Sequence, residues 1–142
     1  MDNVFLDTDV CLDILALRKP YYQKSIELLR LRESTQKVRL CISESSIPNL
    51  IYFTMYKYKV EDAYVKLLDW IETCSLFSIG DKDFILEALK SEFHDKEDAI
   101  QYYTAIRGKV DYFITRNKKD YEPFGSSIPI FTPSEFLAVY DK

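Results

Sequence analysis

A short apolar run near the N-terminus constrains the fold of this chain more than any other feature. Residues 4–6 are Val-Phe-Leu, and Asp7, Thr8 and Asp9 follow directly before a helical pattern begins. This is the pattern of a buried parallel strand that delivers a carboxylate to the carboxyl edge of its sheet. Ligands of open α/β sheets bind outside this edge. The sequence therefore predicts a parallel sheet with a functional site beside Asp7.

Two other polar segments are predicted to reach the same place. A second strand-like run at 112–115 ends in the polar segment 116–120, and an acidic segment at 95–98 opens a helix. Because the carboxyl ends of parallel strands lie at one edge, we expect these three segments to meet. We interpret the meeting point as a site for a divalent metal ion.

Strand and helix patterns alternate along the whole length. This alternation predicts a three-layer α/β/α sandwich in which a central, mostly parallel sheet is covered by helices on both faces, in one domain at 1–142. Strands are expected at 4–6, 38–42, 75–79, 111–115 and 128–131. Helices are expected at 10–17, 21–33 and 46–59, from 60, from 81 or 83, through 99–106, and from 132.

Three details of packing also follow from the pattern. The helix at 46–59 is expected to be buried over most of its circumference in its first half, because it carries few polar residues there. The helix after Val60 is expected to bury a stripe that has Trp70 on or beside it; the stripe consists of Tyr64, Leu67, Leu68 and Ile71. Pro129 marks the last strand as an edge strand, since proline cannot donate to a sheet ladder.

Charge and composition limit the functional classes. The formal net charge of −4 argues against a protein that coats nucleic acid nonspecifically, although basic residues cluster locally. No apolar run approaches the roughly 20 residues of a membrane span, and no secretion signal begins the chain, so we expect a cytoplasmic protein without a membrane segment. The cysteines, Cys11, Cys41 and Cys74, stand far apart among apolar neighbours, which predicts buried free thiols.

The acidic segment allows two interpretations. Asp95 and Asp98 are three residues apart at a helix start, which is a plain capping arrangement. A cap explains one acid, but three acids in four residues repel one another unless they are spread apart or neutralised. The excess is a sign of a cation site. The single histidine, His94, is expected at the surface.

Asn49 leaves a similar choice open. It is a polar residue in an otherwise apolar helix, so it needs a hydrogen-bond partner. Its amide either bonds a neighbouring structural element or faces the site, because this helix follows the carboxyl end of a strand.

In their order, these motifs resemble the PIN domain family, and within it the bacterial branch of VapC-type toxins. The resemblance covers nearly the whole chain. It rests on Phe-Leu-Asp-Thr-Asp-Val at 5–10, Asp-Lys-Glu-Asp-Ala-Ile-Gln-Tyr-Tyr-Thr-Ala at 95–105, Tyr-Phe-Ile-Thr-Arg-Asn-Lys-Lys-Asp-Tyr at 112–121 and Ile-Pro-Ile-Phe-Thr-Pro-Ser-Glu-Phe at 128–136.

The resemblance implies a ribonuclease that depends on Mg²⁺ or Mn²⁺, often the toxin of a toxin–antitoxin pair and often a homodimer. By position, Asp7 and Asp98 match the first and third acids of the family. Asn49 and Asn117 stand where the family has its second and fourth acids, so two of four expected carboxylates are amides. We count all four as candidate catalytic residues.

Mg²⁺ prefers hard oxygen ligands and is usually held by one or two carboxylates plus substrate phosphate, so Asp7 and Asp98 suffice for one ion. Asp95 and Asp120 are additional metal-ligand candidates; Asp9, Glu97 and Glu44 are further nearby acids. The candidates for binding the RNA backbone or water are Thr8, Thr115, Arg116, Lys118 and Lys119.

Two alternatives remain beside an endoribonuclease. The amides Asn49 and Asn117 are compatible with a catalytically weakened PIN domain that binds RNA or a protein without cleavage. The Asp-Thr-Asp start is compatible with a phosphatase or a phospho-receiver domain in which Asp7 is phosphorylated, but the chain lacks a suitably spaced lysine after a late strand. The enzyme hypothesis requires that Asp7 and Asp98 share one pocket and that neither is held in a salt bridge.

Overall fold

Five parallel strands form the centre of the molecule, in the order β3-β2-β1-β4-β5. The computed structural model describes residues 1–123 and 127–140. The strands are β1 (Asp2–Leu6), β2 (Val38–Ser43), β3 (Ser75–Phe77), β4 (Tyr112–Ile114) and β5 (Ile130–Phe131). The predicted parallel sheet is confirmed, with the N-terminal strand at its centre and the strand after Pro129 at an edge.

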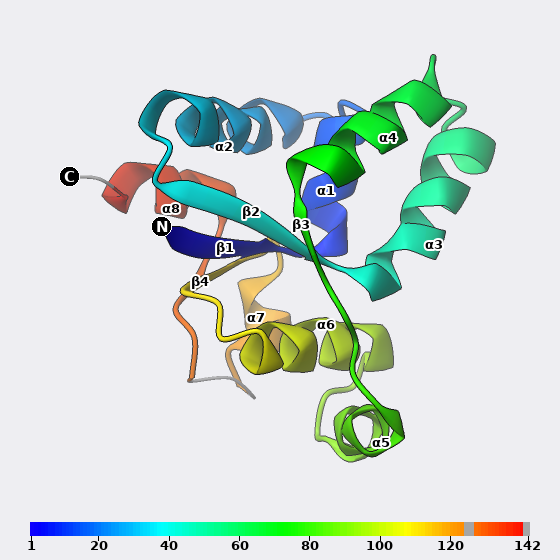
Figure 1. Ribbon diagram of the computed structural model, residues 1–142, viewed down its shortest axis with the longest axis vertical. Helices are drawn as coiled ribbons and strands as arrows, with labels where there is room; N and C mark the ends of the chain where they lie inside the picture. The colour runs from blue at the N-terminus through cyan, green and yellow to red at the C-terminus, as the bar shows by residue number, and fades with distance from the viewer. Residues whose placement is uncertain (124–126, 141–142) are drawn as a thin grey trace.

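Helices lie on both faces of this sheet (Figure 1). They are α1 (Thr8–Leu15), α2 (Tyr22–Thr35), the 3₁₀ helix η1 (Glu44–Ser46), α3 (Ile47–Ile51), the π-helix η2 (Tyr52–Lys57), α4 (Ala63–Thr73), α5 (Lys82–Lys90), α6 (Lys96–Arg107), α7 (Lys118–Tyr121) and α8 (Pro133–Val139). Helices α1, α2, α4 and α8 lie on one side of the sheet in Figure 1, and α5, α6 and α7 lie on the other. The predicted three-layer α/β/α architecture is confirmed.

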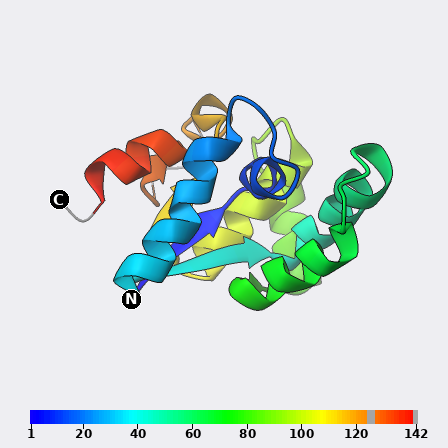
Figure 2. The ribbon, with the colours of Figure 1, turned by 90° about the horizontal axis from the view of Figure 1, so that it is seen from above.

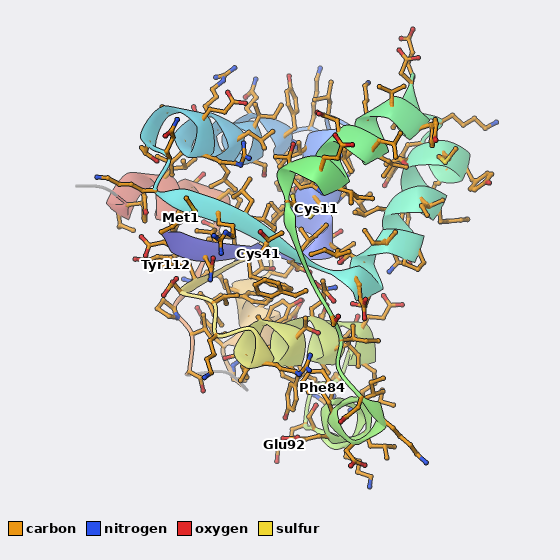
Figure 3. All side chains as sticks on the ribbon, viewed as in Figure 1. Met1, Cys11, Cys41, Phe84, Glu92 and Tyr112 are labelled. Atoms are coloured by element: carbon orange, nitrogen blue, oxygen red, sulfur yellow. The ribbon has the colours of Figure 1, made fainter. Side chains whose placement is uncertain are left out.

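The alternation of side chains along each strand divides the core in two. Val4 and Leu6 pack in one cluster with α1, α2, α4 and α8, whereas Phe5 between them packs in the other with α6 and α7. Successive residues of a strand point to opposite faces, so a strand covered on both faces must be apolar throughout. Figure 3 shows the same division for two labelled thiols, Cys11 on α1 and Cys41 on β2. The three cysteines are buried and free, as predicted.

The segment predicted as one helix at 46–59 differs from the prediction. It is divided into η1, α3 and η2, and it projects with α4 at one end of the molecule (Figure 2). In its first half, Ile51 is 39% exposed and Tyr52 is 55% exposed, so the expected burial of that half was wrong. The apolar pattern was read correctly, but α3, η2 and α4 form an arm that extends beyond the end of the sheet (Figure 2). Much of this arm therefore has no other layer to pack against.

The buried face of α4 was also assigned to the wrong stripe. Ala63, Leu67 and Trp70 face the core, whereas Tyr64 is 64% exposed and Leu68 is 46% exposed. Both sets of residues follow helical spacing and share Leu67, so the pattern alone did not separate them. The indole of Trp70 decides the orientation, because it is the largest apolar group on the helix. The prediction that Trp70 is a core residue is confirmed.

One helix was not predicted. The polar segment after β4 contains α7, which carries the fully buried Tyr121 into the core beneath the sheet edge. Asp81, one of the two proposed start residues for α5, is its N-cap and accepts a hydrogen bond of 3.0 Å from the backbone N–H of Phe84. Among the described residues no helix has both the length and the apolar character that a bilayer-spanning segment needs.

Candidate active site

Asp7 lies where β1 ends and α1 begins, at the carboxyl edge of the sheet. It is the N-cap of α1, and its Oδ1 accepts a hydrogen bond of 2.7 Å from the backbone N–H of Thr8. Its Oδ2 accepts a hydrogen bond of 2.9 Å from the hydroxyl of Thr115, which directly follows β4. Asp7 is only 4% exposed. Two neighbouring parallel strands thus hold both of its carboxylate oxygens.

Asp98 reaches the same edge from the first turn of α6. Its Oδ1 accepts a hydrogen bond of 3.0 Å from the phenol of Tyr121 on α7. Asp95 is the N-cap of α6, and its Oδ1 accepts hydrogen bonds of 2.9 and 3.0 Å from the backbone N–H groups of Glu97 and Asp98. The N-terminal end of a helix favours negative charge, which helps to explain why acids gather here.

Asp7 and Asp98 line one cavity of about 450 Å³. The acids on its wall are Asp7, Asp9, Asp95, Glu97 and Asp98, and the apolar residues are Leu12, Pro48, Phe53 and Ile100. Neither Asp7 nor Asp98 forms an ion pair with a lysine or arginine in the described part of the chain. The two conditions that the sequence set for an enzyme are therefore met.

The environment shifts both carboxyl groups toward neutrality. Burial raises the pKa of Asp7 from 3.8 to about 7, and the charge of Asp98 adds to the rise. Burial also raises the pKa of Asp98, to about 6, with Asp95 contributing further. The hydrogen bonds from Thr115 and Tyr121 act in the opposite direction. Buried carboxyl groups that titrate near neutral pH are characteristic of functional sites.

The acids of the segment 95–98 are spread over different partners. Asp95 caps the helix, Glu97 accepts a hydrogen bond of 3.4 Å from the amide of Asn49, and Asp98 accepts one from Tyr121. The cluster alone therefore does not require a cation. The stronger sign is that the partly buried Asp98 shares one cavity with the buried Asp7.

The two amides occupy different positions. Asn49 lines the cavity and also bonds Glu97 on α6, so both interpretations of this residue apply at once. Asn117 stands at the N-cap position of α7, but its side chain makes no capping hydrogen bond there. Its backbone N–H donates to the Thr115 hydroxyl at 3.1 Å. Asn117 is not among the residues that line the cavity.

A family model described as a PIN domain matches residues 3–119, which is most of the chain. The chain belongs to the PIN domain family. No curated protein matches the sequence.

Solved structures with this PIN fold include three of toxin–antitoxin complexes. VapBC2 of Rickettsia felis, bound to a DNA fragment from its promoter, contains a chain with a TM-score of 0.66 and 19% identity, covering 92% of this chain and 98% of that one. DNA-bound VapBC of Salmonella typhimurium contains a chain with a TM-score of 0.70 and 21% identity, covering 94% of this chain and 99% of that one. A toxin–antitoxin complex from Klebsiella pneumoniae contains a chain with a TM-score of 0.62 and 22% identity, covering 92% of this chain and 97% of that one.

The donor set of this PIN domain fits a hard divalent cation better than zinc. Asp7 and Asp98 supply carboxylate oxygens to one cavity, and Mg²⁺ is commonly bound by one or two carboxylates with waters and phosphate completing its shell. Zinc needs three or four protein ligands, often nitrogen or sulfur. Within residues 1–123 and 127–140, no three side chains of the His, Cys, Asp or Glu types are grouped so that they could hold a metal ion.

The two additional metal-ligand candidates lie farther out. Asp95 lines the cavity, but it is exposed and one of its oxygens caps α6. Asp120 lines a neighbouring hollow, which Asp95 and Asp98 also line. His94 lines this second hollow as well and is exposed, as predicted.

The predicted RNA-binding residues differ in their availability. Thr115 bonds Asp7, and the hydroxyl of Thr8 lies 2.8 Å from that of Ser46. Lys118 pairs with Glu135 and Glu122, at 3.2 and 3.3 Å. Lys119 is exposed beside Asp120 in the second hollow.

Arg116 is engaged in a buried ion cluster that the sequence interpretation missed. Its Nε lies 2.6 Å from Oδ2 of Asp13, a residue of α1 that is 0% exposed, and its guanidinium lies 3.9 Å from the ring centre of Tyr21. Arg18 holds the other oxygen of Asp13 at 2.7 Å and also pairs with Asp9 at 3.1 Å. This cluster ties the exit of β4 to α1, immediately beside the Asp7–Thr115 hydrogen bond.

One signal would have identified this cluster. Asp13 is a charged residue inside the apolar stretch Val10–Leu15 of a helix, and a buried acid requires a cationic partner. Arg18, five residues later, is the nearest candidate in the sequence. Tyr121 gave no comparable signal, because an aromatic residue after a polar segment does not reveal that its hydroxyl reaches Asp98.

Proposed function

We propose that this PIN domain is a metal-dependent endoribonuclease that cleaves RNA phosphodiester bonds. The observation that carries the proposal is the shared cavity of Asp7 and Asp98, two carboxyl groups with raised pKa values at the carboxyl edge of a parallel sheet. Mg²⁺ or Mn²⁺ is the proposed cofactor, and Asp7 and Asp98 are the residues that would hold it.

The surrounding side chains have orienting roles in this proposal. Thr115 and the backbone N–H of Thr8 fix the two oxygens of Asp7, and Tyr121 fixes one oxygen of Asp98. The remaining carboxylate lone pairs of Asp7 and Asp98 would be available to hold a metal ion. A divalent ion bound there would activate water and offset the negative charge of the scissile phosphate. Asn49 supplies an amide at the cavity wall, where the family places an acid.

The direct test is RNA cleavage by the whole chain with Mg²⁺, with Mn²⁺ and with EDTA. The wild-type protein, Asp7→Asn, Asp98→Asn and the surface control Asp69→Asn are compared on the same single-stranded RNA. We expect cleavage only with a metal ion, near-complete loss in both site variants and full activity in the control. Cleavage that persists in EDTA, or in Asp7→Asn, would refute the proposal.

A binding module without catalysis is the second candidate, and a specific observation favours it. The amides Asn49 and Asn117 and the lack of a third grouped carboxylate, in the part of the chain the structure describes, reduce the negative charge available to a metal ion. In this case the protein would bind RNA or a protein without cutting RNA. Equal, metal-independent RNA binding by the wild type and Asp98→Ala, without cleavage products from either, would favour this candidate.

We further propose that the protein acts in the cytoplasm as the toxin of a toxin–antitoxin pair and forms a homodimer. Structures with the same fold come from complexes named toxin–antitoxin or VapBC. The exposed aromatic residues of the α3–η2–α4 arm, including Tyr52, Tyr56 and Tyr64, provide apolar surface for such contacts. Co-expression with the product of the adjacent reading frame, followed by co-purification and by measurement of RNA cleavage, tests the pairing. Light scattering of the purified chain tests the homodimer.

A further inference from the structure

A chain of buried hydrogen bonds connects α6 to the residue that follows Asp7. Gln101 is 4% exposed, and its Nε2 donates to the hydroxyl oxygens of Ser46 and Ser45, at 2.8 and 3.1 Å. The hydroxyl of Ser46 lies in turn 2.8 Å from that of Thr8. Thr8 is partly exposed and lines the acidic cavity, whereas Ser46 is completely buried. The chain therefore ends at the cavity wall.

The direction of these hydrogen bonds follows from the number of protons. The amide nitrogen of Gln101 only donates, so the Ser46 oxygen accepts from it and keeps its own proton to donate. If Thr8 also donated to Ser46, the buried Ser46 proton would be left without an acceptor among its hydrogen-bond partners, which is unfavourable. If Ser46 donates to Thr8, the Thr8 proton is directed to the cavity, where water or a ligand can accept it. The second arrangement is the stable one.

The orientation of the Gln101 carboxamide follows from the same count. As placed, one buried acceptor, Oε1, has no partner. With the amide turned over, the two N–H donors would lose their serine partners and only the oxygen would be satisfied. Leaving one acceptor unpaired costs less than leaving two donors unpaired. The orientation that sends the Thr8 proton outward is therefore favoured.

We propose that Gln101 is a positioning residue for the substrate: through Ser46 it holds the Thr8 hydroxyl as a hydrogen-bond donor toward a non-bridging phosphate oxygen of bound RNA. The inference rests on the proposed function, which places RNA in this cavity. None of the described residues that line the cavity is a lysine, arginine or histidine, so a phosphate there needs neutral donors in addition to a metal ion. One N–H of the Asn49 amide bonds Glu97, so its second N–H and the Thr8 hydroxyl are neutral donors that remain for a phosphate.

The test is a double-mutant cycle on RNA affinity. Fluorescence anisotropy with a labelled single-stranded RNA and Mg²⁺ is measured in the Asp98→Asn background, in which the proposed function predicts no cleavage. The cycle comprises this background alone, with Gln101→Met, with Thr8→Val, and with both. We expect each single change to weaken binding about tenfold, the loss of one hydrogen bond to a charged group. The double variant should bind no more weakly than Thr8→Val, because Gln101 acts through Thr8.

Two further variants separate positioning from folding. Gln101→Glu keeps the size of the side chain and, when ionised, only accepts, so Ser46 must donate to it and Thr8 must turn toward Ser46. Because the new charge repels phosphate in either background, the test is the difference: Gln101→Glu should lose more affinity when Thr8 is present than in Thr8→Val. Gln23→Met, an exposed residue of α2, is the matched control and should bind normally. Thermal unfolding confirms that each variant is folded.

The outcomes are distinguishable. Additive losses for Gln101 and Thr8, or a normal affinity of Gln101→Met, would overturn the positioning role while leaving the nuclease proposal intact. RNA binding with the expected coupling, but no cleavage by the wild type, would support the Gln101 role and refute the enzyme. An absence of RNA binding in all of these proteins would overturn both.

Discussion

Replacing Asp7 by asparagine should stabilise the metal-free protein at alkaline pH. An acid whose pKa is higher in the folded state than in the unfolded state binds more protons when folded. The free energy of unfolding therefore falls as pH rises from the unfolded pKa of 3.8 to the folded pKa of about 7, and it stays low above this window. Asparagine is neutral at every pH, so it avoids this loss.

The magnitude follows from the shift. The pKa of Asp7 rises from 3.8 in the unfolded chain to about 7 in the folded protein, a difference of roughly 3. This rise lowers the free energy of unfolding by about 4 kcal/mol at pH 8 and by about 1 kcal/mol at pH 4.5. Asparagine keeps the acceptor for the Thr8 N–H, but it exchanges the oxygen that accepts from Thr115 for a donor, a loss of about 1 kcal/mol. We therefore expect Asp7→Asn to have a free energy of unfolding about 3 kcal/mol higher than that of the wild type at pH 8. For a domain of this size this raises Tm by roughly 10 °C.

Thermal or urea unfolding of both proteins in EDTA at pH 4.5 and pH 8 measures this difference. Asp69→Asn, a substitution at an exposed carboxylate of α4, is the control and should change stability by less than about 0.5 kcal/mol at either pH. Adding Mg²⁺ at pH 8 should stabilise the wild type and have little effect on Asp7→Asn, because a ligand stabilises only the form that binds it. A variant that is less stable than the wild type at pH 8, or an equal difference at both pH values, would refute the reasoning.

Three other predictions concern the same region. Mg²⁺ affinity measured by calorimetry should rise at least about tenfold between pH 5.5 and pH 8, since protons compete for Asp7 and Asp98 below their pKa values; a flat profile would contradict this. Tyr121→Phe should remove about 1 kcal/mol of stability at pH 7 and raise the pKa of Asp98, followed by NMR, because the phenol favours the ionised form. Asp13→Asn should destabilise by about 3 kcal/mol in urea unfolding, because two guanidinium groups lose their buried partner. Glu27→Gln, which breaks an exposed pair, is its control and should cost less than about 1 kcal/mol.

The fold was largely predictable because its strands are covered on both faces. A strand such as β1 must be apolar at successive positions and must end abruptly at the sheet edge, so the run before Asp7 gave both its position and its direction. The arm formed by α3, η2 and α4 was less predictable. Several of its apolar residues, among them Tyr52, Tyr56 and Tyr64, face solvent, and no pattern in one sequence separates a face that packs on a core from a face that lacks a neighbour.

The parts of the site that directly follow strands were predictable, because the ends of the strands were. Asp7 and Thr115 follow strands that are paired, and their hydrogen bond is a direct consequence of strand order. The roles of Arg116 and Tyr121 depend on side-chain contacts across helices. Arg116 was interpreted as a residue that meets RNA because it stands beside the site, but Asp13, 103 residues earlier, occupies its guanidinium. A contact over such a separation leaves no local trace.

The electrostatic reasoning that identified the acids also needs one revision. Mutual repulsion was taken as the sign of a cation, yet the structure offers other means of relief: a raised pKa lets Asp7 and Asp98 retain protons, and Thr115 and Tyr121 donate hydrogen bonds to them. Repulsion alone is therefore compatible with a metal-free fold. What distinguishes a metal site is that the relief is incomplete at alkaline pH, where the protons leave and the buried charges remain. A cation that binds there relieves part of this repulsion, so the same buried charge that destabilises the metal-free protein at alkaline pH favours metal binding.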